Sequence, residues 1–135
     1  MQCLVALVFK PSSDPISLID MPSTCRSVNA ARSLAAGRII PQDDPRTIAD
    51  GLRTSLGERT FAVISRAVDG IATATEEGIV GAMRLTWEKM RIVVEASSAV
   101  PLACLMERTL DLAGQRVGVI VSGGNVDLDR LPWQR

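Results

Sequence analysis

A short apolar run near the end of the chain most constrains what this sequence can fold into. Residues 117–121 read Val-Gly-Val-Ile-Val, and a short run rich in β-branched residues is typical of a strand buried on both faces. The run stops at Ser122-Gly123-Gly124-Asn125, where two glycines let the backbone turn sharply or lie close against a ligand. We therefore expect a buried strand followed by a tight polar turn.

The polar turn is a candidate binding site. Ligands in open α/β sheets sit in the crevice beyond the carboxyl ends of the strands, and the hydroxyl of Ser122 and the amide of Asn125 fall at such an end. A plain polar turn after a core strand explains the same residues without any ligand. The spacing alone leaves both interpretations open.

The rest of the chain from Asn29 onward alternates helical patterns with short apolar runs. Apolar spacing and turn residues predict helices over 29–36, 58–68, 76–90 and 96–108, and strands over 3–9, 16–19 and 71–74. This alternation argues for an α/β fold with a mostly parallel sheet. Gly37 is suited to end the first helix, and Thr75 to cap the third. The buried side of that third helix is expected to comprise Ile79, Val80, Met83, Leu85, Trp87 and Met90.

Composition describes one ordinary domain with an aliphatic core. The chain has 135 residues, of which 47% are hydrophobic and only 3% aromatic, and this length suffices to bury roughly two-thirds of the unfolded surface. Residues 1–28 are atypical, since three prolines and many small polar residues interrupt any helical period there. We expect this amino-terminal segment to be distinct from the regular part, 29–135.

Charge and residue usage exclude several classes of function. Fifteen basic and fifteen acidic residues cancel, so no net field attracts nucleic acid or an anionic membrane. Histidine and tyrosine are absent, which removes the commonest general base. Cys3, Cys25 and Cys104 fit neither a disulfide framework nor a zinc site, and Cys104 is expected in the core. The apolar start is too short to span a membrane and lacks the features of a signal peptide, so we expect a cytoplasmic protein.

Three motifs occur together in the order of one known family. They are 47–52, Thr-Ile-Ala-Asp-Gly-Leu; 94–99, Val-Glu-Ala-Ser-Ser-Ala; and 121–128, Val-Ser-Gly-Gly-Asn-Val-Asp-Leu. From about Asn29 to Arg135 the chain resembles the carboxyl-terminal part of the fold-type II pyridoxal-phosphate enzymes. Within them it resembles the serine/threonine dehydratase and serine racemase group, with the bacterial threonine or hydroxyaspartate dehydratases nearest. The resemblance implies part of a tryptophan synthase β-like fold, a three-layer α/β/α arrangement.

The resemblance also implies cofactor contacts for four residues of these motifs. In the family, the hydroxyl that matches Ser122 hydrogen-bonds the pyridine nitrogen of pyridoxal 5'-phosphate. The positions of Gly123 and Gly124 keep side chains away from the ring face. Gly51 would sit close to both cofactor and substrate. These residues are the cofactor-binding candidates, together with Glu95.

Glu95 matches the glutamate of the family's Glu-Pro-Ser-Gly-Ala motif, which lies near the cofactor pocket. Here Ala96 and Ser98 stand in place of the proline and the glycine, so the loop geometry differs from the family pattern. An acidic residue at this point also suits the start of a helix, where the dipole favours negative charge. Both roles for Glu95 remain open.

Two parts of the family's site have no counterpart here. The family's Schiff-base lysine lies in a Ser-Phe-Lys-x-Arg-Gly context, whereas this chain has only Lys10, followed by Pro11, and Lys89, expected on a polar helix face. The glycine run whose amides cradle the cofactor phosphate is also missing. At the family's divalent-ion position stand Ser23, Ser27 and Asn29, a poor set for Mg²⁺. We therefore expect no catalytic lysine, no metal and only one half of a cofactor site.

The resemblance implies a lyase that acts on a small hydroxy amino acid. Such an enzyme removes the β-hydroxyl of L-threonine, L-serine or 3-hydroxyaspartate and yields a 2-oxo acid and ammonia. We expect this chain alone to be an inactive fragment of such an enzyme, with a homo-oligomer as a possible assembly. The alternatives are a non-catalytic pseudoenzyme or assembly module that pairs with a full-length homologue, or a serine racemase.

Overall fold

The computed structural model describes the backbone of residues 3–8 and the whole of residues 29–134. The elements in chain order are β1 (Cys3–Val8), α1 (Asn29–Ala36), the 3₁₀ turn η1 (Asp50–Leu52), α2 (Glu58–Ala67), β2 (Gly70–Thr75), α3 (Glu76–Met90) and α4 (Ala96–Met106). The strand expected at 16–19, most of the segment 1–28, and Lys10 with it lie outside the described residues.

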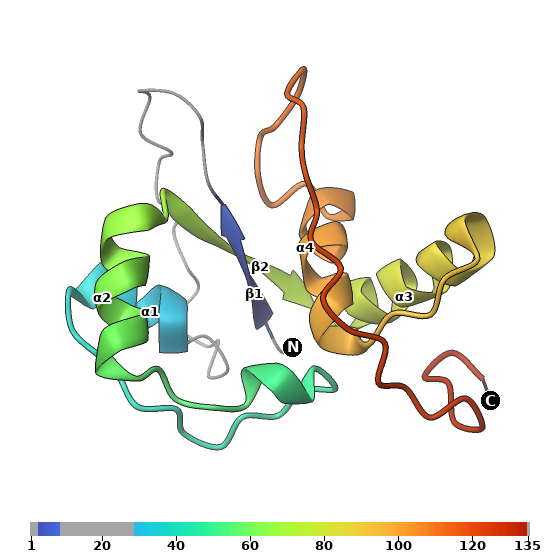
Figure 1. Ribbon diagram of the computed structural model, residues 1–135, viewed down its shortest axis with the longest axis horizontal. Helices are drawn as coiled ribbons and strands as arrows, with labels where there is room; N and C mark the ends of the chain where they lie inside the picture. Colours follow the sequence, from blue (N-terminus) through green and yellow to red (C-terminus); the bar gives the residue numbers. More distant parts are fainter. Residues whose placement is uncertain (1–2, 9–28, 135) are drawn as a thin grey trace.

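The described elements form helical layers around a two-stranded ladder (Figure 1). β1 and β2 pair antiparallel, with Cys3 opposite Thr75 and Val8 opposite Gly70. Helix α1 contacts β2, while α4 contacts both strands and α3 packs along α4. Figure 1 shows α1 and α2 on one side of the ladder and α4 on the other. The described part is thus layered but mostly helical.

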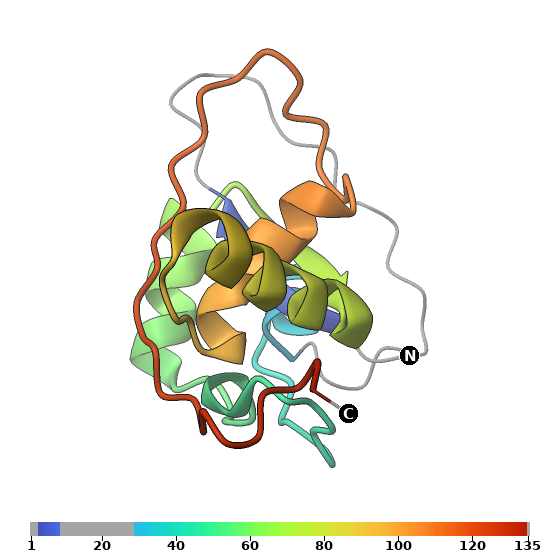
Figure 2. The same cartoon turned by 90° about the vertical axis from the view of Figure 1, so that its right-hand side faces the viewer.

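The expected mostly parallel sheet is wrong for the described residues. They contain one antiparallel pair of strands, and residues 117–121 are not a strand but an extended, unpaired segment, drawn as a tube in Figures 1 and 2. Ile120 is 82% exposed, Val117 45% and Val121 44%. A strand forms only where a neighbour accepts its backbone hydrogen bonds, and no strand in the described part of the chain lies beside this segment.

Local sequence signals set the helices where the sequence predicts them. The backbone N–H of Gly78 donates to the side-chain oxygen of Thr75 over 3.0 Å, which confirms Thr75 as the N-cap of α3. Gly37 adopts φ +63° after α1, the left-handed conformation that favours glycine at a helix end. The predicted ends of α2 and α3 agree with the structure within one residue because these signals act within a few residues.

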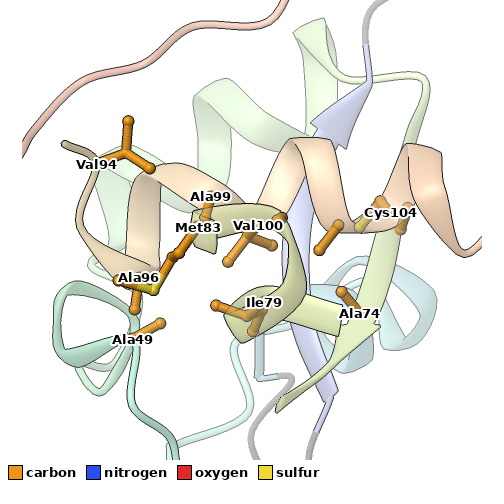
Figure 3. Packing of buried hydrophobic residues seen from close by; sticks show 12 residues of the cluster. Ala49, Ala74, Ile79, Met83, Val94, Ala96, Ala99, Val100 and Cys104 are labelled. Atoms are coloured by element: carbon orange, nitrogen blue, oxygen red, sulfur yellow. The ribbon is translucent and has the colours of Figure 1, made fainter. Parts of the chain in front are cut away.

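The core lies between α3, α4 and β2 and is made of small aliphatic side chains (Figure 3). Ile79 and Met83 of α3 face Val100 of α4, and Ile79 and Val100 have no exposed surface. Full burial of an aliphatic side chain such as Ile79 contributes about 1.5–3 kcal/mol to folding. Cys104 is 1% exposed, which confirms it as a core residue.

The carboxyl-terminal end of α3 is more exposed than the sequence pattern predicts. Trp87 is 39% exposed and Met90 59% exposed, whereas the pattern predicts that both are buried. The ring of Trp87 lies edge-on to that of Trp133, with the ring centres 6.5 Å apart. No helix among the described residues is long and apolar enough to cross a membrane.

Candidate functional site

The three sequence motifs meet at the amino-terminal end of α4. The backbone N–H of Glu95 donates to the carbonyl oxygen of Gly123 over 3.1 Å. On the same helix end, the hydroxyl oxygen of Ser97 accepts a hydrogen bond from the N–H of Gly51 over 3.1 Å. Helix α4 therefore joins η1 to the loop 121–125, and the candidate residues form one cluster.

The Glu95 carboxylate faces the loop instead of capping its own helix. Glu95 is the N-cap residue of α4, but its side chain makes no cap hydrogen bond. Its Oε2 accepts from the N–H of Asn125 over 3.1 Å, while its carbonyl oxygen accepts from the N–H groups of Ser98 and Ala99. Glu95 thus stands at the helix start and also fixes the loop that contains Ser122.

Gly123, Gly124 and Gly51 allow close approach by the protein's own atoms. A Cβ added at Gly123 would lie 2.6 Å from the carboxyl carbon of Glu95, and one at Gly124 would lie 2.9 Å from the carbonyl oxygen of Val93. At Gly51 it would lie 2.9 Å from the Ser97 hydroxyl oxygen. None of these three has the left-handed φ of a sharp glycine turn, so space rather than backbone freedom requires glycine here.

Ser98 belongs to the cluster, although the sequence does not predict it as a site residue. Its hydroxyl oxygen lies 3.2 Å from that of Ser122, and either oxygen can donate. Ser98 is only 3% exposed, whereas Ser122 is exposed. A buried hydroxyl therefore orients an exposed one. The resemblance marks Ser98 only as the residue that replaces the family's glycine, and it assigns the hydroxyl no role.

The remaining candidates lie apart from this cluster or add nothing to it. Lys89 is exposed in the last turn of α3, as expected of a surface lysine. Within the described ranges, 3–8 and 29–134, no group of three or more acidic or cysteine side chains could hold a metal ion.

The described residues form helical layers around a short antiparallel ladder, and a glycine-rich polar loop lies against the start of α4. Residues 5–123 match the profile of the family described as "Pyridoxal-phosphate dependent enzyme". The match covers well over half of the chain, and the chain therefore belongs to the pyridoxal-phosphate dependent enzyme family.

The relatives place the chain in the dehydratase and racemase group. It is 52% identical over 105 residues to the beta-hydroxyaspartate dehydratase of Paracoccus denitrificans, covering 78% of this chain and 33% of that protein. Maize serine racemase matches with a TM-score of 0.72 and 39% identity, over 78% of this chain and 34% of that chain. The T.th. threonine deaminase matches with a TM-score of 0.65 and 44% identity, over 76% of this chain and 38% of that chain. The chain spans about a third of the length of the curated relatives it matches.

The chemistry of the cluster can be compared with that of pyridoxal phosphate. Ser122 presents an exposed neutral hydroxyl, a group that can donate to or accept from a pyridine nitrogen. Lys89 is the one lysine among residues 29–134 and lies on another helix, so none of these residues fits the cofactor's aldehyde. The close approach at Gly123 is filled by Glu95 itself. The described residues therefore offer one hydroxyl that could pair with a ring nitrogen, and they offer no lysine at the cluster for the aldehyde.

Proposed function

We propose that this chain supplies the ring-facing half of the cofactor site of a hydroxy amino acid ammonia-lyase. The substrate class is L-threonine, L-serine or 3-hydroxyaspartate, and the products are a 2-oxo acid and ammonia. The observation that carries the proposal is that Glu95, Ser98 and Ser122 meet with Gly51 and Gly123 in one hydrogen-bonded cluster. The dehydratase and deaminase names of the relatives support the reaction class.

The Ser122 hydroxyl is proposed to bind the ring nitrogen. A neutral hydroxyl supplies no negative charge, so it does not favour a protonated ring as a carboxylate would. Ser98 holds this hydroxyl from the buried side at 3.2 Å, and Glu95 holds the loop through Asn125. When bound, pyridoxal phosphate supplies the electron-withdrawing ring that this chemistry requires.

The isolated 135-residue chain is expected to have no measurable turnover. The covalent anchor and the phosphate cradle position the cofactor in the family, and positioning accounts for a large part of such catalysis. Purified chain with pyridoxal phosphate should release no ammonia above a protein-free blank from L-threonine, L-serine or 3-hydroxyaspartate. Sustained release would show that a complete site exists in this chain.

A chimera tests the half-site itself. Residues 29–134 replace the matched third of the Paracoccus relative, which then supplies the remaining parts of the site. The chimera should release ammonia from a hydroxy amino acid, and Ser122→Ala should lower the rate by about tenfold, the effect of losing one hydrogen bond of about 1.4 kcal/mol. Ser65→Ala, at an exposed serine of α2, is the matched control and should leave the rate unchanged. If Ser122→Ala leaves the rate of an active chimera unchanged, Ser122 does not contribute to the cofactor site.

A non-catalytic role is the second candidate, and the absence of a suitable lysine among residues 29–134 favours it. Borohydride reduction with pyridoxal phosphate should leave no stoichiometric adduct on the chain. An adduct on Lys89 or Lys10 would contradict both this role and the inactive half-site. The racemase alternative is separated by assaying the same chimera for D-serine formed from L-serine.

A further inference from the structure

Two hydroxyl groups meet in the candidate site, one buried and one exposed. The oxygen of Ser98 lies 3.2 Å from that of Ser122, and either oxygen can donate. Ser98 is 3% exposed, while Ser122 faces solvent. A hydroxyl carries one hydrogen and two lone pairs, so only one of the two hydrogens lies between these oxygens. Which hydrogen lies there decides what the exposed side of Ser122 offers to a ligand.

Burial favours Ser98 as the donor in this pair. Its hydroxyl has no other hydrogen-bond partner in the part of the chain that the structure describes. If Ser98 accepted from Ser122, the Ser98 hydrogen would be buried and unpaired, which is costly. Ser122 meets no such penalty, since water reaches its hydrogen when no ligand is bound. The Ser122 hydrogen therefore points away from Ser98 and toward the open side of the cluster.

Helix α4 holds the buried hydroxyl in place. The N–H of Ser98 donates to the carbonyl oxygen of Glu95 over 3.1 Å, so its backbone is part of the first helical turn. The preceding residue, Ser97, accepts instead from the N–H of Gly51, because consecutive helical side chains point about 100° apart. Ser97 therefore does not compete for the contact with Ser122. A hydroxyl fixed on a helix thus directs one that lies in a loop.

We infer that Ser98 is a positioning residue that turns the Ser122 hydrogen toward the ligand, so that the site selects an aromatic nitrogen with a free lone pair. A hydrogen bond donated to such a nitrogen stabilises its unprotonated form. The Glu-Pro-Ser-Gly-Ala motif has glycine where this chain has Ser98, so the second hydroxyl is not part of that motif. The identity of the ligand rests on the proposed function, whereas the direction of the hydroxyl depends on this chain alone.

Solution NMR on the full 135-residue chain tests the direction of the hydroxyl without any cofactor. In an equal mixture of light and heavy water, the Cβ signal of a serine splits in two when its hydroxyl exchanges slowly, because hydrogen and deuterium shift the carbon differently. A buried hydrogen bond slows exchange, so the Cβ signal of Ser98 should split while that of Ser122 stays single. A split Ser122 signal, or a single Ser98 signal, would overturn the inference.

The chimera with the Paracoccus relative tests the consequence for the ligand. Its affinity for pyridoxal phosphate is compared with its affinity for the deaza analogue, in which a C–H group replaces the ring nitrogen. Ser98→Ala should lower the ratio of the two affinities about threefold, because a freed Ser122 hydroxyl points at the nitrogen in one of three staggered positions. Thr86→Val, which removes another hydroxyl at a 3% exposed position, is the matched control and should leave the ratio unchanged.

The outcomes distinguish failure of this inference from failure of the proposed function. An affinity ratio that Ser98→Ala leaves unchanged, or that Thr86→Val lowers equally, overturns the positioning role and leaves the proposed function in place. A chimera that binds both compounds equally well shows that Ser122 does not contact the ring nitrogen, and overturns both. A chimera that binds neither compound overturns the proposed function and the choice of ligand, while the NMR measurement still decides the direction of the hydroxyl.

Discussion

Gly123 and Gly124 are adjacent, yet their missing side chains make room for different kinds of neighbour. An added Cβ at Gly124 meets the backbone carbonyl of Val93, whereas at Gly123 it meets the flexible end of Glu95. Gly124→Ala should lower the free energy of unfolding by about 1–3 kcal/mol, since backbone must shift. Gly123→Ala should lower the free energy of unfolding by about 1 kcal/mol, because the new Cβ displaces the Glu95 side chain and breaks its hydrogen bond with Asn125. Urea denaturation of both variants measures the difference.

A second substitution distinguishes these two causes. Glu95→Ala removes the side chain that a Cβ at Gly123 would displace, so Gly123→Ala should cost little more in that background. Glu95→Ala leaves Val93 in place, so Gly124→Ala should lower the free energy of unfolding by the same amount with or without it. If Glu95→Ala reduces the effect of both glycine substitutions equally, the two glycines share one neighbour.

At the residue scale, the order of the motifs predicted which residues gather but not how they touch. Gly51, Glu95 and Ser122 were singled out from the sequence, and the structure brings all three to one end of α4. The contact between Ser98 and Ser122 spans 24 positions and depends on how α4 packs against the loop. No local pattern encodes such a contact, and that is why Ser98 was missed.

At the element scale, α3 is held at its first turn by the end of α4. Both the N–H and the hydroxyl of Thr75 donate to the carboxylate of Glu107, the N–H over 3.1 Å, while the Thr75 oxygen accepts from Gly78. Thr75→Ala should lower the free energy of unfolding by about 1–2 kcal/mol because it removes the cap. Thr75→Ser, which keeps the hydroxyl, should cost far less. Circular dichroism during urea unfolding measures both.

The contact with Glu107 gives that prediction a further signature. If Thr75 and Glu107 act together, the cost of Thr75→Ala and Glu107→Ala combined should be smaller than the sum of the two, by about 0.5–1 kcal/mol. Thr60→Ala, at an exposed position of α2, is the control. Its effect on the free energy of unfolding and that of Glu107→Ala should sum in the double variant. Additive costs for Thr75 and Glu107 would show that α3 is capped by Thr75 alone.

Elements defined by neighbouring residues were predictable, and those defined by a distant partner were not. Thr75 and Gly37 act within one turn of their helices, and the structure confirms both. Residues 117–121 carry a strand's composition, but a strand also needs a second strand beside it. The same limit applies to Met90, whose burial on α3 would require a neighbour on that face, whereas Trp87 is only partly covered by Trp133.

At the scale of the whole molecule, two isoleucines contrast the buried core with the exposed segment 117–121. Ile79 has no exposed surface, and Ile120 is 82% exposed. Ile79→Ala should lower the free energy of unfolding by about 2–5 kcal/mol, since it empties part of the core. Ile120→Ala should change the free energy of unfolding of the isolated chain by less than about 0.5 kcal/mol, as is usual at exposed positions.

Urea denaturation of both variants measures this difference. A large loss of stability from Ile120→Ala would mean that Ile120 is buried in the folded chain. That outcome would restore the buried strand that the sequence predicts at residues 117–121.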